Sequence, residues 1–198
     1  QNILDLCAFK NKNCEVITRA SSGEILELVD GPVNLNNTTV AGMDVVMHYG
    51  LRRDIGKWDF SANFSKLREF TEVSTLSDGS TQSLNKVGTA ASRESYPEWR
   101  STLSARWKHE QWSAAYSARF IGETTETYNS EALAISSITY HNISAGYDFN
   151  NGLKTKVGIN NLTDKQPPVS LTNTNINFDQ NTYNAIGRYM YVQLNYDF

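Results

Sequence analysis

Long segments in which apolar and polar residues alternate are the feature that most constrains how this chain can fold. Alternation with a period of two gives a β-strand two different faces. The last segment shows it most clearly, with its apolar positions at Met190, Val192, Leu194, Tyr196 and Phe198. The seven segments with this pattern are 41–51, 57–66, 98–107, 112–121, 138–149, 153–160 and 189–198.

The length of these segments separates two all-β architectures. Strands in soluble proteins are typically about 5–6 residues long. A strand that crosses a bilayer at a tilt needs about 9–11 residues, and the segments here run to about 9–12. The pattern therefore favours an antiparallel transmembrane β-barrel over a soluble sandwich.

The connections between the segments alternate in length. The short ones span 52–56, 108–111 and 150–152, the last being an Asn-Asn-Gly turn. The long, polar ones span about 67–96, 122–137 and 161–183. Short turns on one rim and long loops on the other are typical of outer-membrane barrels, in which the short turns face the periplasm.

Composition and charge exclude several other classes of protein. Mean hydropathy is −0.47 and no run of about 18 apolar residues occurs, so no transmembrane helix is predicted. A net charge of −3 excludes a general nucleic-acid binder. The 8 Phe, 4 Trp and 10 Tyr need packing partners, which argues against disorder.

Several aromatic residues lie at the ends of the predicted strands. Rings at both ends of a barrel strand bridge the headgroup and hydrocarbon regions of a membrane. The alternative is that they form the ordinary core of a sandwich. These residues are Trp58, Trp99, Trp107, Trp112, Phe149 and Phe198.

The two cysteines, Cys7 and Cys14, are close in sequence, and the chain has no others. Such a pair predicts a disulfide that closes a small loop in an oxidising compartment. Two free thiols are the alternative. A zinc site is disfavoured because none of the three histidines has a ligand spacing to the cysteines.

An odd number of strands predicts that this barrel segment belongs to a larger barrel. Single-chain bacterial barrels have even strand numbers and leave no open edge in lipid. Counting back from Phe198 at the periplasmic rim makes 1–38 an exterior loop region with the cysteine pair, and 39–198 the barrel strands. An eight-stranded barrel would require 24–34 to cross the membrane as well.

Two stretches of sequence resemble a known family. Residues 158–168, GINNLTDKQPP, are similar to a strand-and-loop motif of TonB-dependent receptors, carried here by Gly158, Asn160, Asn161, Leu162, Asp164 and Pro167. The alternate residues Val192, Leu194, Tyr196 and Phe198 resemble the C-terminal signal that the barrel-assembly machinery reads. Weaker similarities to strand starts of these receptors occur at 40–45 and 96–100.

The resemblance implies the C-terminal part of a 22-stranded barrel in the outer membrane of a Gram-negative bacterium. Such receptors take up siderophore-iron, vitamins, haem or oligosaccharides, with energy supplied by TonB acting through a plug domain. The implied partners are outer-membrane lipid, the assembly machinery, the plug of the same full-length chain, TonB and a small imported ligand, with no cofactor. The plug, the TonB box and the first strands are not in this sequence. A small stand-alone barrel with a structural or adhesive role is the alternative.

The sequence contains no Ser-His-Asp motif, zinc-protease motif or phosphate-binding loop, so we expect no enzyme. A barrel hydrolase using a lumen serine such as Ser104 or Ser117 is a third, weaker hypothesis. Charged residues of the polar face are interpreted as a hydrated wall that grips the plug, and His48 and His141 as wall residues. These charged residues are Asp44, Lys57, Asp59, Arg100, Arg106, Arg119, Lys154 and Lys156. Ligand contact is expected instead from loop aromatics, namely Phe70, Tyr128 and Phe178.

Overall fold

The computed structural model describes residues 4, 7, 8, 14–28, 36–75, 80–91 and 94–198. Its regular structure in these ranges is almost entirely β-strand. Within them, no helix has the length and hydropathy that a membrane span requires.

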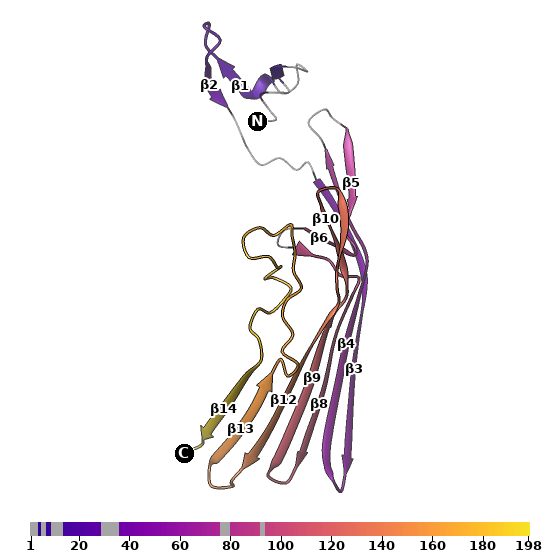
Figure 1. Ribbon diagram of the computed structural model, residues 1–198, viewed down its shortest axis with the longest axis vertical. Helices are drawn as coiled ribbons and strands as arrows, with labels where there is room; N and C mark the ends of the chain where they lie inside the picture. Colours follow the sequence, from indigo (N-terminus) through magenta and orange to yellow (C-terminus); the bar gives the residue numbers. More distant parts are fainter. Residues whose placement is uncertain (1–3, 5–6, 9–13, 29–35, 76–79, 92–93) are drawn as a thin grey trace. The chain divides into compact units, whose positions relative to one another are not determined.

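Each of the seven predicted segments is a strand of one antiparallel sheet, which confirms the predicted fold class. The sheet follows the order β14-β13-β12-β9-β8-β4-β3, so each of these long strands pairs with the next long strand along the chain (Figure 1). The strands are β3 (Asn36–Arg53), β4 (Gly56–Thr75), β8 (Trp99–His109), β9 (Trp112–Ile121), β12 (Ile138–Asp148), β13 (Leu153–Asn160) and β14 (Tyr189–Tyr196).

The predicted loop 67–96 is partly wrong, because β4 continues to Thr75 and pairs with β5 (Thr81–Asn85). This extension has few apolar side chains on either face, so its alternation is weak in the sequence. Backbone pairing from Thr71 to Thr75 nevertheless holds it as a strand. Two short strands follow it, β6 (Thr89–Ala91) and β7 (Glu94–Ser95).

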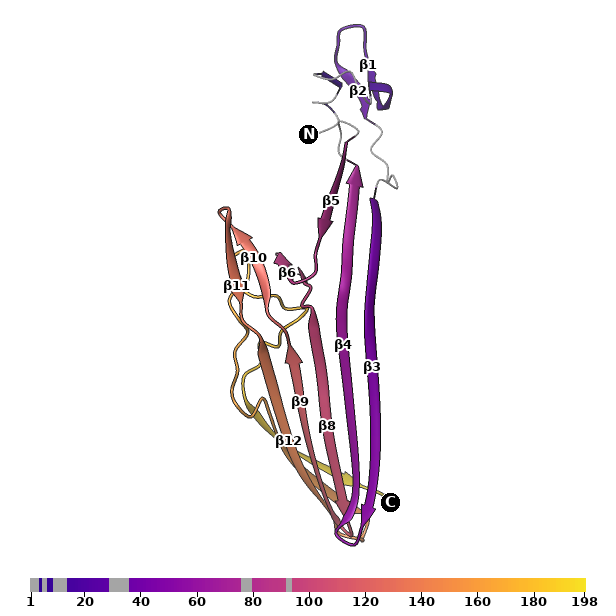
Figure 2. The ribbon, with the colours of Figure 1, turned by 90° about the vertical axis from the view of Figure 1, so that its right-hand side faces the viewer.

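The predicted loop 122–137 is also regular. It forms a hairpin of β10 (Thr124–Tyr128) and β11 (Glu131–Ile135), seen above β9 and β12 in Figure 2. Asn129 and Ser130 connect its strands with φ of 50° and 68°, the conformation of a tight two-residue hairpin turn. β10 pairs in parallel with β6, which makes a second sheet of order β11-β10-β6-β7.

By contacts the chain divides into two units, 1–40 with 70–85, and 41–69 with 86–198. The first unit contains a 3-10 turn, η1 (Cys14–Val16), and a two-stranded sheet of β1 (Ile17–Arg19) and β2 (Ile25–Leu28). β2 pairs with β1, so the described part of 24–34 does not join the main sheet as an eighth long strand. Residues 29–34 lie outside the described ranges.

The second unit has a small buried cluster at one place only among its described residues. It lies where the 161–188 connection meets β6, β9, β11 and β12, and Phe178 packs against it. Its members are Ala90, Ile121, Ile135, Ile138, Tyr140 and Tyr183. Elsewhere both faces of the long strands are open, and large apolar side chains such as Met190 and Val192 are more than two-thirds exposed.

Candidate functional site

The register of the main sheet gathers apolar side chains on one face. Trp58 lies opposite Trp107, and Phe60 opposite Ala105. Ala105 in turn lies opposite Tyr116 of β9, whose partner on β12 is Ile143. Because strand partners point to the same side, this row continues across four strands as an exposed apolar band.

Aromatic rings concentrate on this face next to the short turns. Trp58 stacks on Phe60 with ring centroids 5.9 Å apart. Tyr147 meets the Trp112 ring at 4.7 Å and the Phe149 ring at 4.8 Å. The indole of Trp107 also donates a hydrogen bond to the Ile55 carbonyl in the turn, at 2.8 Å. Further pairs join Tyr49 to Phe60 and Tyr196 to Phe198.

Trp99 marks the opposite end of the apolar band. The Lys66 ammonium lies 4.6 Å from the centre of its ring and 3.2 Å from the Glu98 carboxylate. Trp99 and Trp107 stand at the two ends of β8. At about 3.3 Å per residue, a strand tilted by about 40°, as in membrane barrels, would place them about 20 Å apart along the barrel axis. That height is close to the apolar band of about 25 Å on membrane barrels.

The other face of the sheet is polar. Asp59 lies opposite Arg106 and forms an ion pair with Lys57 at 3.6 Å. Arg106 and Lys156 both line a shallow hollow over β9 and β12, whose floor includes Ala115. The exposed charges here are suited to contact with water or with a polar protein surface.

The serines that the hydrolase hypothesis would use have structural partners. Ser104 Oγ and Ser61 Oγ are hydrogen-bonded to each other at 2.7 Å. Ser117 Oγ accepts a hydrogen bond from the side-chain Nδ2 of Asn142 at 3.2 Å. His141 Nδ1 is hydrogen-bonded to the Tyr116 hydroxyl at 2.7 Å. Within the described ranges, no group of His, Cys, Asp and Glu is arranged to hold a metal ion.

The motif at 158–168 closes the end of β13. The Asn161 side chain donates to the Lys165 carbonyl at 2.8 Å and accepts from the Lys165 amide at 2.9 Å. The Asn161 amide donates to Asn142 Oδ1 of β12 at 2.9 Å, and the Leu162 amide to the His141 carbonyl at 2.7 Å. With φ of 51°, Asn161 adopts a left-handed conformation that asparagine tolerates well.

The same motif ties the end of β13 to the start of β14. Asp164 Oδ1 accepts a hydrogen bond from the Arg188 amide at 2.7 Å. Asn160 is the last residue of β13 in register with Tyr189. Gly158 lies under the ring of Tyr191, where a Cβ would come within 2.5 Å of ring atoms. Asn161, Asp164 and Gly158 therefore make the neck of the 161–188 connection, while Pro167 is half-buried just beyond it.

Glu126 is a residue that sequence reasoning missed. It lies on β10, is only 2% exposed, and accepts four hydrogen bonds from the 161–188 connection. Ser170 Oγ donates at 2.7 Å, the Leu171 amide at 2.8 Å, and Thr172 through its hydroxyl at 2.8 Å and its amide at 3.2 Å. Burial alone would raise the pKa of this carboxyl, but the four donors outweigh burial and hold the pKa below its usual value.

The three predicted ligand-contact aromatics have different surroundings. Tyr128 lies at the β10–β11 turn and is 40% exposed. Phe70 is half-buried within β4 rather than in a loop. Phe178 is partly buried, because it packs against the buried cluster that includes Tyr183. Folding of the 161–188 connection onto the sheet, which alternation does not reveal, lowers its exposure.

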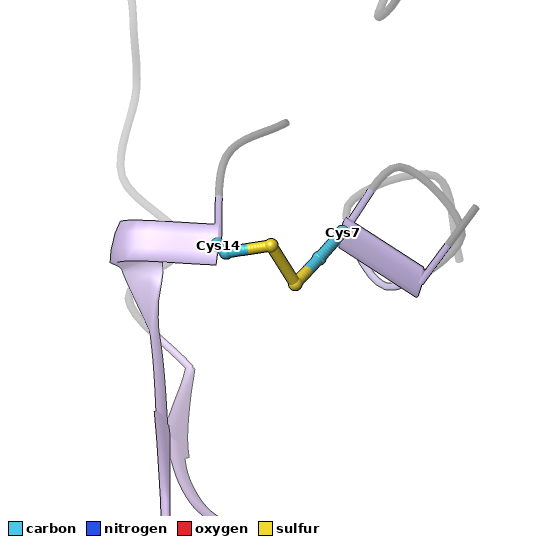
Figure 3. Close-up of a disulfide and its surroundings, with 2 residues drawn as sticks. All are labelled: Cys7 and Cys14. Carbon is cyan, nitrogen blue, oxygen red and sulfur yellow. A yellow bond between two sulfur atoms is a disulfide. The ribbon is translucent and has the colours of Figure 1, made fainter. Parts of the chain in front are cut away.

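The last strand ends the described sheet and leaves its side chains open. Val192, Leu194 and Tyr196 are each more than half exposed, and Phe198 is fully exposed beyond the end of the strand. In the first unit, Cys7 and Cys14 are joined by a disulfide, shown in Figure 3.

Comparison with known proteins identifies the family. A family model described as "TonB dependent receptor-like, beta-barrel" matches residues 8–162, well over half of the chain. The chain belongs to this family. In this TonB-dependent receptor-like barrel, the match includes Gly158, Asn161 and Leu162 of the motif and ends before Asp164.

Among solved structures, the "Copper transporter OprC" is similar at 11% sequence identity with a TM-score of 0.39. The similarity covers 84% of this TonB-dependent receptor-like chain and 29% of the transporter, so the chain spans less than a third of that protein's length. A search of curated proteins gives no match.

Proposed function

We propose that the chain is the C-terminal barrel portion of a TonB-dependent outer-membrane receptor for energy-coupled uptake of a scarce nutrient, namely siderophore-iron, a vitamin or an oligosaccharide. The family match over 8–162 is the observation that carries this proposal. The sheet supports it, because its apolar face has a height close to that of the apolar band on membrane barrels and its opposite face is polar.

The two faces have different partners in this proposal. The apolar band, with aromatic rings near Trp107 and Trp99 at its two ends, contacts outer-membrane lipid. The polar face, with Arg106 and Lys156, contacts water and the plug domain of the full-length chain, through which TonB acts. The receptor would lie in the outer membrane of a Gram-negative bacterium.

Orientation follows from the lengths of the connections. The turns after Arg53, His109 and Asp148 are short and would face the periplasm, whereas the β10–β11 hairpin and the 161–188 connection would face the exterior. Residues 1–38, with the Cys7–Cys14 disulfide, would then form an exterior region and 39–198 the barrel wall. Of the predicted contact aromatics, Tyr128 remains the most accessible one for a ligand.

Nutrient uptake by cells that carry or lack the complete gene tests this proposal. Radiolabelled ferric siderophores, cobalamin and maltooligosaccharides would be offered separately to both strains, each with and without active TonB. We expect the deletion to abolish uptake of one class, and only where TonB is active. Uptake that is the same in both strains for every class would reject a role in importing these nutrients. Lipid or peptide hydrolysis that depends on Ser104 or Ser117 would instead support an enzyme.

A further inference from the structure

The connection between β13 and β14, residues 161–188, is folded although it contains no long element of regular structure. It is drawn in gold in Figure 1, above β13 and β14. Within it, the Ser170 amide donates to the Asn177 carbonyl at 2.8 Å, and the Asn173 side chain donates to the Phe178 carbonyl at 2.6 Å. The segment from Ser170 to Tyr183 is therefore a body held together by hydrogen bonds of its own.

This body is attached to the rest of the unit in two ways. At its neck, Asp164 and Arg188 hold the two ends of the connection together. Away from the neck, it docks through the four hydrogen bonds to Glu126 and through one from the Arg119 guanidinium to the Thr182 carbonyl at 3.1 Å. Glu126 thus provides most of the polar attachment of the body to β10.

The docked interface buries polar groups as well as apolar ones. Five side-chain oxygen atoms are buried there, namely Ser95 Oγ, Thr124 Oγ1, Tyr140 Oη, Asp179 Oδ2 and Tyr183 Oη. The Tyr183 hydroxyl has the Thr124 and Ser95 hydroxyls as its polar neighbours, and Tyr140 has the Asn184 backbone. Water would serve these groups about equally well in an undocked body, so their burial adds little net stability to docking.

These five side chains gather at one place. Tyr183 belongs to the same buried cluster as Tyr140, and the Thr124 and Ser95 hydroxyls face the Tyr183 hydroxyl with Asp179 close by. The interface therefore combines a strong attachment at Glu126 with a polar contact beside it that contributes little net stability. Such a balance suits a contact that opens and closes while the strands stay paired.

We propose that residues 161–188 form a reversible flap, hinged at its Asp164–Arg188 neck and latched to β10 by Glu126. When the latch opens, the flap uncovers Arg119, Tyr140 and the Thr124 and Ser95 hydroxyls on the polar side of the wall. Glu126 acts as a positioning residue, since it holds the flap and contacts neither ligand nor lipid. The proposal does not depend on which nutrient the receptor imports.

A spin label on the flap of the complete natural protein in detergent tests the latch. The label is placed at Thr174→Cys, an exposed flap position, and Cys7 and Cys14 do not compete for it because they are bonded to each other. We expect an immobile spectrum in the otherwise natural protein and at least a five-fold larger mobile fraction in Glu126→Ala. Glu126→Gln, which keeps the side-chain shape, should give an intermediate value. Glu131→Ala, which removes an exposed carboxylate of the same hairpin, is the matched control and should change nothing.

Three results would overturn the proposal. A label that is equally immobile in Glu126→Ala shows that Glu126 is not the latch, and if that variant does not fold, the same result in Glu126→Gln decides. A label that is fully mobile without any substitution shows that the flap is not docked. On heating, mobility should rise reversibly below the temperature at which the barrel loses its heat-modifiable gel mobility. A label that loosens only together with the barrel would reject a separate flap.

Discussion

The Asp164 carboxylate accepts a hydrogen bond from the backbone amide of Arg188 at 2.7 Å, across 24 residues of chain. This bond brings together the two ends of the 161–188 connection just above the last register pair, Asn160 and Tyr189. Because Asp164 has a φ of 53°, its position also suits a residue type that tolerates the left-handed region. The neck therefore constrains the last two strands and the flap together.

Asp164→Ala should destabilise the protein by about 1–2 kcal/mol, because it leaves the Arg188 amide without its acceptor and places alanine at positive φ. Asp164→Asn retains an acceptor and tolerates this φ, so it should cost less than about 1 kcal/mol. Urea unfolding of the complete protein in detergent measures both. Equal losses for the two variants would show that the acceptor at Asp164 is not what stabilises the neck.

Gly158→Ala tests the contact between β13 and β14. The new Cβ would meet the end of the Tyr191 side chain, which would have to move away. We expect displacement of this ring to lower the free energy of unfolding by about 1 kcal/mol. In a Tyr191→Ala background the same substitution should cost almost nothing. The coupling energy from this double-mutant cycle is the measured quantity, and a value of zero would contradict the contact.

Docking of the flap should depend on pH at two limits. The pKa of Glu126 in the folded protein lies below its usual 4.5. Its contribution to the stability of the docked flap is therefore complete above pH 4.5 and is lost as the pH falls through the folded pKa. Burial raises the pKa of Tyr183 above 10.0. The neutral Tyr183 hydroxyl therefore contributes fully to the stability of the docked flap below pH 10, and this contribution declines as the pH rises further. The spin label at position 174 should report a docked flap between these limits. Glu126→Gln should remove the acid limit and leave the alkaline one.

Deletion of Phe198 should lower the amount of full-length receptor that reaches the outer membrane. The residue is fully exposed beyond the end of β14, so its loss removes little packing within the chain. We expect a severalfold decrease in heat-modifiable protein in isolated outer membranes. Deleting the exposed side chain of Met190 from the same strand, as Met190→Ala, is the control. An unchanged amount of receptor without Phe198 would reject the terminal-signal interpretation.

Cys7 and Cys14 should be unreactive in protein that is denatured without reductant, because they are joined. Maleimide labelling followed by mass spectrometry should find no modified cysteine before reduction and two after it. Cys14→Ser should leave one reactive thiol. Labelling of both cysteines without reduction would show that the protein is made with free thiols.

Alternation along the long strands sufficed to predict the main sheet. Residues such as Trp58 and Phe60 identify an apolar face, and a one-residue change in register would turn every side chain to the other face, so the pairing is strongly specified. The β4 extension and the β10–β11 hairpin were missed because neither has a sustained alternation of apolar and polar side chains. Their pairing depends on backbone hydrogen bonds, as between Thr71 and Asn85, which leave no pattern in the sequence.

The motif residues and the flap also show which features the sequence predicts and which only the structure reveals. Asn161 and Asp164 were found by resemblance, but the hydrogen bonds that explain them, to Lys165 and Arg188, are visible only in three dimensions. Glu126 stands in an unremarkable polar stretch, and its partners are 44 to 46 residues away. Such a distant contact is set by how the chain folds back on itself.

The sequence by itself determined the all-β class, the seven long strands, their two faces and the family, because these follow from local periodicity and short motifs. Only the tertiary structure decided that the 161–188 connection folds onto the wall, that Phe178 packs against the buried cluster and that Glu126 holds the connection. Those features come from contacts between segments far apart in the chain, and their energies are shared between partners that no local pattern identifies.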